Sequence, residues 1–101
     1  MKRIRIADTL LLTGDAVAEL VADYATLLAR VNSADKVKLQ AIDEGGDLVD
    51  ASVVLTAATT VIVESTNSPT PDPPNEAAVA YIRGRLERWD AGFSEPAPVS
   101  D

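Results

Sequence analysis

The segment STNSPTPDPPNEAA, residues 65–78, carries four prolines and separates two regular parts of the chain. Proline fixes φ and lacks a backbone N–H, so such a segment ends the strand before it and delays the next helix. Asn75 then suits the N-cap of a helix. An apolar stripe follows at spacings of three, four and three residues: Val79, Ile82, Leu86 and Trp89. We therefore expect a helix directly after the prolines.

The same segment decides whether the chain forms one domain or two. An isolated helix of about 15 residues is marginal in water, so the second helix must pack on what precedes it, with Trp89 in the core. This favours a crossing loop over residues 66–74 inside one domain, residues 1–92, followed by a disordered tail over residues 93–101. The alternatives are a linker and a proline-rich recognition peptide. PDPP has the PxxP spacing of such peptides, but no basic residue accompanies it.

The length and composition are those of a small globular protein. The chain has 101 residues, of which 47% are hydrophobic and 25% charged, so it has room for one core. Its basic start resembles that of a signal peptide, but Arg5 and Asp8 interrupt the apolar run. No run approaches the roughly 18 apolar residues of a membrane span. We expect a cytoplasmic protein without a membrane segment, and the excess of Arg over Lys suggests GC-rich bacterial coding.

The first half of the chain predicts a strand and a helix. Residues 3–6, RIRI, alternate with period two, as a half-buried strand does, and the leucines at 10–12 either extend it or form a second strand. Thr13 or Asp15 can cap the helix that follows. Its stripe at three- and four-residue spacing consists of Val17, Leu20, Val21, Tyr24, Leu27, Leu28 and Val31.

Residues 36–55 predict a β-hairpin with Gly45 and Gly46 at its tip. Placing Asp43 opposite Val49 collects the apolar side chains on one face, whereas a slip of one residue mixes the faces. A bend at residues 57–60 then leads into VIVES, residues 61–65, as the third strand of a meander. The chain is therefore expected to be a small α+β domain in the order β-α-β-β-β-α. Its two helices pack on one face of a mainly antiparallel sheet.

The residue types argue against an enzyme. Without cysteine there is no thiolate nucleophile, and without histidine the usual general base at neutral pH is missing. Asp43 and Asp50 lie near each other in the predicted hairpin, but paired carboxylates need one buried member to separate their pKa values. A hairpin end is a poor place for burial. We expect no catalytic residues and no cofactor.

The middle of the chain is acidic, and its hairpin is one candidate binding site. The net charge is −7, and residues 40–82 contain seven acidic residues and no basic one. The sequence DEGGDLVD, residues 43–50, offers oxygen ligands for a hard cation but lacks the spacing of an EF-hand loop. We expect no metal site here. The carboxylates of Asp43, Asp47 and Asp50 instead suit a basic protein partner.

The second candidate site is the sheet face turned away from the helices. Ile42, Val54 and Ile62 are expected on that face. A contiguous patch would indicate a protein interface, with a homodimer through two sheets as the simplest closed assembly, whereas scattered residues are typical of an ordinary solvated face. We therefore predict a non-catalytic protein-interaction or regulatory module that acts through this open face or the acidic hairpin.

Nucleic-acid binding is the alternative prediction. Five arginines on the first strand and last helix provide the basic side chains: Arg3, Arg5, Arg83, Arg85 and Arg88. The negative net charge and the few aromatic residues, 4% of the chain, make this binding less favourable, and the same arginines can pair locally with acidic neighbours.

Overall fold

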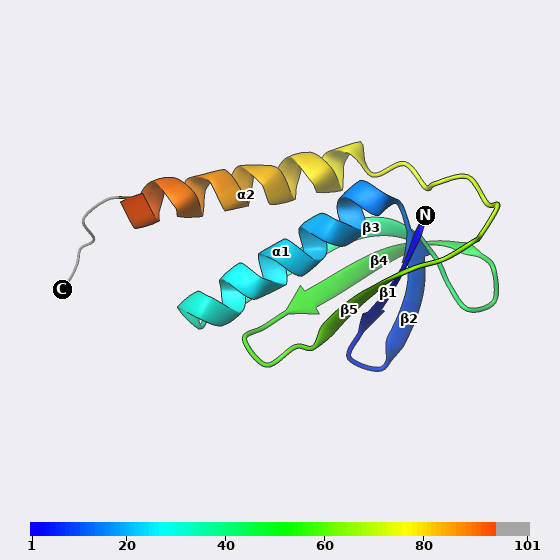
Figure 1. Ribbon diagram of the computed structural model, residues 1–101, viewed down its shortest axis with the longest axis horizontal. Helices are drawn as coiled ribbons and strands as arrows, with labels where there is room; N and C mark the ends of the chain where they lie inside the picture. The colour runs from blue at the N-terminus through cyan, green and yellow to red at the C-terminus, as the bar shows by residue number, and fades with distance from the viewer. Residues whose placement is uncertain (95–101) are drawn as a thin grey trace.

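The computed structural model describes residues 1–94, with side-chain surroundings up to Trp89. Its elements are β1 (Lys2–Ile6), β2 (Thr9–Thr13), α1 (Asp15–Val31), β3 (Asp35–Ile42), β4 (Leu48–Leu55), β5 (Val61–Ser65) and α2 (Glu76–Ser94). The strands form one antiparallel sheet in the order β4-β3-β2-β1-β5. Both helices lie on one side of the strands (Figure 1). The predicted α+β class is confirmed, and residues 10–12 belong to a separate strand. Residues 95–101 of the predicted tail lie outside the described residues.

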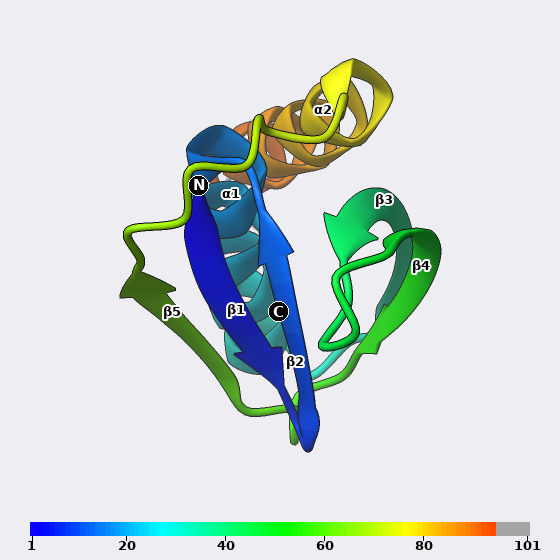
Figure 2. The same ribbon diagram turned by 90° about the vertical axis from the view of Figure 1, so that its right-hand side faces the viewer.

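The sheet separates between its middle strands β2 and β3, and α1 packs on β1 and β5. β2 and β3 share only the pair Leu12–Ile42, so the β3–β4 hairpin diverges from the other three strands (Figure 2). Fully buried α1 side chains such as Tyr24 and Leu28 belong to one core cluster with Ile4 of β1 and Leu55 of β4. The helices therefore cover one side of the sheet, which we call the inner face. Its other side, the outer face, carries the alternate residues of each strand.

The hairpin of β3 and β4 has the predicted faces but a different pairing. Ala41 lies opposite Val49, where the sequence predicted Asp43, so the register moves by two residues and each side chain keeps its face. The cause is Asp43, which belongs to the turn. Its carboxylate accepts hydrogen bonds from the N–H groups of Gly45 at 3.0 Å and Asp47 at 2.9 Å.

The predicted meander is wrong, because β5 pairs with β1 at the opposite edge of the sheet from β4. Thr56 and Thr59 form the turn after β4, and the Thr60 carbonyl then accepts a 3.0 Å hydrogen bond from the N–H of Ala7. On the outer face Arg3 lies 3.4 Å from Glu64. These contacts carry β5 to β1 and leave β4 at an edge.

Residues 66–74 lead from β5 to α2, which packs on α1 and β3 (Figure 1). Pro73 is buried, and Asp72 lies 3.5 Å from the amino group of Met1. α2 packs on the rest of the domain as predicted, but the side chain that it buries most deeply is not the predicted Trp89. Ile82 is fully buried, whereas Trp89 is partly buried at the border of the core.

Candidate functional site

Four apolar side chains lie together on the outer face of the sheet. Leu12 of β2 is paired with Ile42 of β3, and Ile42 with Leu48 of β4, while Leu10 lies two residues along β2 on the same face. Leu48 is 57% exposed and the other three are half-buried. We call Leu10, Leu12, Ile42 and Leu48 the outer patch.

The outer patch contains a hollow of about 290 Å³. Its lining combines apolar side chains with charged ones, namely Arg3, Leu10, Leu11, Leu12, Ile42, Asp43, Glu44 and Thr66. Arg3 is engaged by Glu64 at 3.4 Å, whereas Glu44 is exposed at the turn. An apolar group entering the hollow would meet leucine and isoleucine side chains together with the carboxylates of Asp43 and Glu44.

The structure places all three predicted apolar interface residues on the outer face but does not join them. Ile42 lies in the outer patch. Ile62 is separated from Leu10 by Arg5, which pairs with both residues across the sheet. Val54 lies six residues from Leu48 on β4. Leu10 and Leu12 were missed because the pairing of β2 with β3 is a long-range contact that no local pattern predicts. Leu48 was missed because the predicted hairpin pairing began at Val49 and left Leu48 in the turn.

The three predicted acidic site residues have different surroundings. Asp43 closes the hairpin turn through its hydrogen bonds to the backbone, and Asp47 is exposed beside it. Asp50 lies on β4, where its carboxylate accepts a hydrogen bond from the Gln40 side-chain amide. We call Asp43, Glu44 and Asp47 the acidic turn, which adjoins the outer patch. Within residues 1–94 no group of three or more acidic side chains is arranged to hold a metal ion.

The five arginines of the nucleic-acid prediction do not form one surface. Arg3 and Arg5 alternate with the buried Ile4 and Ile6, so they lie on the outer face, whereas α2 packs on the inner face. On α2, Arg83 and Arg88 are exposed, and Arg85 donates a 3.3 Å hydrogen bond to the Tyr24 hydroxyl. Nucleic-acid binding stays a prediction without an assembled basic patch.

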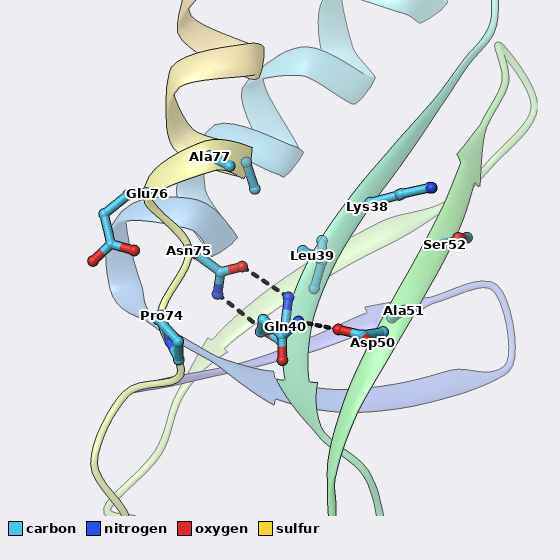
Figure 3. A pocket seen from close by; sticks show the side chains of 11 residues that line it. Lys38, Leu39, Gln40, Asp50, Ala51, Ser52, Pro74, Asn75, Glu76 and Ala77 are labelled. Atoms are coloured by element: carbon cyan, nitrogen blue, oxygen red, sulfur yellow. Dashed lines mark hydrogen bonds between the residues drawn. The ribbon is translucent and has the colours of Figure 1, made fainter.

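A second hollow, of about 510 Å³, lies between the start of α2 and the β3–β4 hairpin (Figure 3). Asn75 links the two parts there. Its Oδ1 accepts a hydrogen bond from the Gln40 N–H at 2.8 Å, and its Nδ2 donates to the Gln40 carbonyl at 2.9 Å and to Thr13 Oγ1 at 3.0 Å. Thr13, predicted as a helix cap, donates to the same carbonyl at 2.8 Å. Hydrogen bonds from the side chains of Asn75 and Thr13 thus replace those of a neighbouring strand where β2 and β3 separate.

These contacts distinguish two roles for Asn75. Aspartate is as good an N-cap as asparagine, but it cannot donate to the Gln40 carbonyl or to Thr13. We therefore expect Asn75→Asp to lower the free energy of unfolding by about 1 to 3 kcal/mol, the cost of leaving part-buried polar groups unpaired. Urea denaturation of the parent, Asn75→Asp and Asn75→Ala measures it. If Asn75→Asp were as stable as the parent, the two hydrogen bonds that the amide donates would not contribute to stability.

A polar cluster that the sequence analysis missed joins α1, β3 and α2. The Asp35 carboxylate accepts hydrogen bonds from the hydroxyls of Tyr24 and of Tyr81, the latter at 2.6 Å, and lies 3.9 Å from Arg85 Nε. Burial acts to raise the pKa of Asp35, but hydrogen bonds from the two tyrosines and the Lys36 N–H, together with the charge of Arg85, hold it below its ordinary value. Burial, and secondly the hydrogen bond to Asp35, raises the pKa of Tyr24 to about 12.

The cluster predicts a loss of stability at both ends of the pH range. A carboxyl group with a lowered pKa stabilises the fold fully above its ordinary value of 3.8, and this contribution is lost as the pH falls further. A tyrosine with a raised pKa stabilises fully below 10.0, and its contribution is lost as the pH rises to about 12. The urea concentration at the midpoint of unfolding should fall as the pH drops below 3.8 and as it rises from 10.0 to about 12. Both decreases should be less steep for Asp35→Asn. If the midpoints of the parent and of Asp35→Asn changed in parallel with pH, the cluster would not be the cause of the pH dependence.

Comparison of the chain with protein-family models, with curated proteins and with solved structures gave no match. In the part of the chain that the structure describes, no helix combines the length and apolar character needed to cross a bilayer.

Proposed function

We propose that this chain is a non-catalytic protein-binding module and that the outer patch with the acidic turn is its binding surface. The observation that carries the proposal is the row Leu12–Ile42–Leu48, which continues across three strands beside the hollow. Contiguous apolar surface rimmed by polar groups is typical of protein interaction sites. The absence of cysteine and histidine, and the exposure of the acidic turn, support a role without catalysis.

The charges around the outer patch indicate the chemistry of the partner. Asp47 and Glu44 are exposed on the acidic turn, and the chain as a whole has a net charge of −7. A segment that places one apolar side chain in the hollow and lysines or arginines beside the acidic turn would match both features. Binding of this kind weakens as salt rises, because the exposed charges are screened.

A selection of displayed random peptides on the immobilised protein tests this proposal. We expect binders that contain an apolar anchor flanked by basic residues. Their affinity should fall at least about tenfold for Leu12→Asp, which puts a charge into the hollow. Ile62→Asp is the matched control, because Ile62 lies on the same outer face, is 44% exposed, and is separated from the outer patch by Arg5.

The outcomes are separable once both variants are shown to melt cooperatively. Binding lost with Leu12→Asp and kept with Ile62→Asp supports the outer patch. Equal losses in both variants, equal retention in both, or a selection that yields no binders would contradict it. Glu44→Gln combined with Asp47→Asn should reduce both the affinity and its salt dependence, and it leaves the Asp43 hydrogen bonds of the turn in place.

A further inference from the structure

We infer that β4 pairs edge to edge with β4 of a second copy of this chain, which forms a symmetric dimer with one continuous sheet. This inference goes beyond the proposed binding surface, because it concerns the edge of the sheet and a different partner. Within the described residues 1–94, β4 is the last strand on its side of the sheet and pairs only with β3 (Figure 2).

The hydrogen bonds of Gln40 establish which backbone groups of β4 point outward. Its N–H and C=O bind the Asn75 side chain, so they point away from β4, and the pair Gln40–Asp50 has no hydrogen bonds within the ladder. In an antiparallel ladder, residue pairs with and without backbone hydrogen bonds alternate. The hydrogen bond from the Asp43 N–H to the Asp47 carbonyl fits this alternation. The backbone N–H and C=O groups at residues 48, 50, 52 and 54 therefore face the free edge.

This edge lacks the features that usually prevent pairing. Exposed edge strands are commonly short, interrupted by proline or a bulge, or guarded by lysine. β4 is eight residues long, LVDASVVL, and contains neither proline nor lysine. It pairs with β3 residue for residue from Leu48 to Leu55. Its one charged side chain, Asp50, accepts a hydrogen bond from Gln40.

The order of side chains on β4 is complementary to itself in one register. If Ala51 lies opposite Ala51 of the second copy, Leu48 lies opposite Val54 and Asp50 lies opposite Ser52, each contact occurring twice. Leu48 and Val54 are 57% and 59% exposed in the single chain, so this register covers two exposed apolar side chains with each other. It also sets each carboxylate opposite a hydroxyl and avoids two aspartates directly opposite each other.

The alternation of outward and inward backbone N–H and C=O groups along β4 also selects this register. Residues 50 and 52 both have outward backbone groups, so they form hydrogen-bonded pairs on either side of the two-fold axis, and Ala51 forms the pair without hydrogen bonds at the axis. Each copy has a net charge of −7, so the two copies repel at long range. Raising the salt concentration should therefore strengthen this dimer, in contrast to the binding of a basic partner.

Sedimentation equilibrium over a range of protein concentrations tests the edge. We expect a monomer–dimer equilibrium that Ser52→Pro weakens at least about tenfold, because each copy loses an outward N–H and gains a ring on the edge. Ser52→Ala is the matched control and should keep the outward N–H and the dimer. A parent that is monomeric throughout would overturn the inference, as would a dimer with the same dissociation constant in Ser52→Pro.

Disulfide trapping tests the register without disturbing the edge. The chain has no cysteine. In Ala51→Cys the two Cα atoms would lie about 4.5 Å apart, within the range of a disulfide, so mild oxidation should yield a covalent dimer. Val54→Cys alone should not, because its two copies would be about 20 Å apart in this register, but a mixture of Val54→Cys with Leu48→Cys should yield the mixed dimer. Covalent dimers from Val54→Cys and none from Ala51→Cys would overturn the register.

Discussion

Tyr24→Ala is expected to lower the free energy of unfolding by about 3 to 5 kcal/mol, the range for removing a large aromatic side chain from a core. Tyr24 is fully buried on α1. Its ring is the largest of the completely buried side chains in the described part of the chain, and its hydroxyl donates to Asp35 and accepts from Arg85. The loss is large beside the 5 to 15 kcal/mol that is typical of whole domains.

Tyr24→Phe separates the ring from its hydroxyl. It keeps most of the packing and removes the hydrogen bonds to Asp35 and Arg85, so we expect a loss of about 1 to 3 kcal/mol. Urea denaturation followed by circular dichroism measures both variants. The account of the core would be wrong if Tyr24→Ala unfolded at the same urea concentration as the parent. If Tyr24→Phe lost as much as Tyr24→Ala, the polar cluster rather than the ring would hold α1 in place.

Ile82→Ala is expected to cost about 2 to 5 kcal/mol and to loosen α2. Ile82 is fully buried where α2 meets the rest of the chain, and the packed neighbours Val79 and Leu86 of the same helix are only partly buried. Removing the branched side chain leaves a cavity that a helix on the surface closes only in part. Far-UV circular dichroism and the fluorescence of Trp89, the one tryptophan of the chain, report the unfolding.

The control for Ile82→Ala is Arg83→Ala on the exposed side of the same helix. It keeps helix propensity and removes no buried contact, so its stability should stay within about 0.5 kcal/mol of the parent. If both variants were equally stable, α2 would not be docked, and residues 66–74 would be a linker between independent parts.

The elements in which a periodic apolar pattern marks one buried face were predicted from the sequence. The stripe of α1 and the alternation in β3 and β4 follow from burial of one face, so both were predicted from residues within a few positions of each other. The turn of the hairpin was placed one residue too late. The apolar pattern does not distinguish Asp43 as the last residue of a strand from Asp43 as the residue that closes the turn with its carboxylate.

Long-range pairing was outside the reach of such patterns. β5 has the sequence of a good strand, but whether β1 or β4 receives it depends on contacts such as Ala7 N–H to Thr60 carbonyl, between residues 53 positions apart. The turn at Ala7 carries a positive φ of 53° without glycine or asparagine, so the β1–β2 hairpin lacked its usual signal. Without that hairpin, Leu10 and Leu12 could not be placed beside Ile42.

The polar cluster was missed for a related reason. Tyr24 sits in the apolar stripe of α1, where its ring alone explains its position. A tyrosine within such a stripe, followed after the helix by an aspartate, was the available signal, because a buried hydroxyl usually finds a partner. That Tyr81 and Arg85 complete the cluster depends on how α2 docks.

The two inferred interactions are compatible with each other. The β4 edge and the hollow of the outer patch lie on different sides of Leu48, so a dimer would leave Leu10, Leu12 and Ile42 open. In the inferred register Val54 of the second copy lies next to Leu48 and extends the apolar row. A dimer would thus present two binding surfaces on one continuous outer face.

Mapping a bound peptide by NMR tests the central claim most directly. The probe is the tightest binder from the peptide selection, added in steps to the isotope-labelled protein at a concentration where the oligomeric state stays constant. We predict that amide shifts change in residues 10–12 and 42–48, around the outer patch and the acidic turn. Changes confined to the hollow beside Asn75 at the start of α2, with residues 10–12 unaffected, would contradict the proposed binding surface.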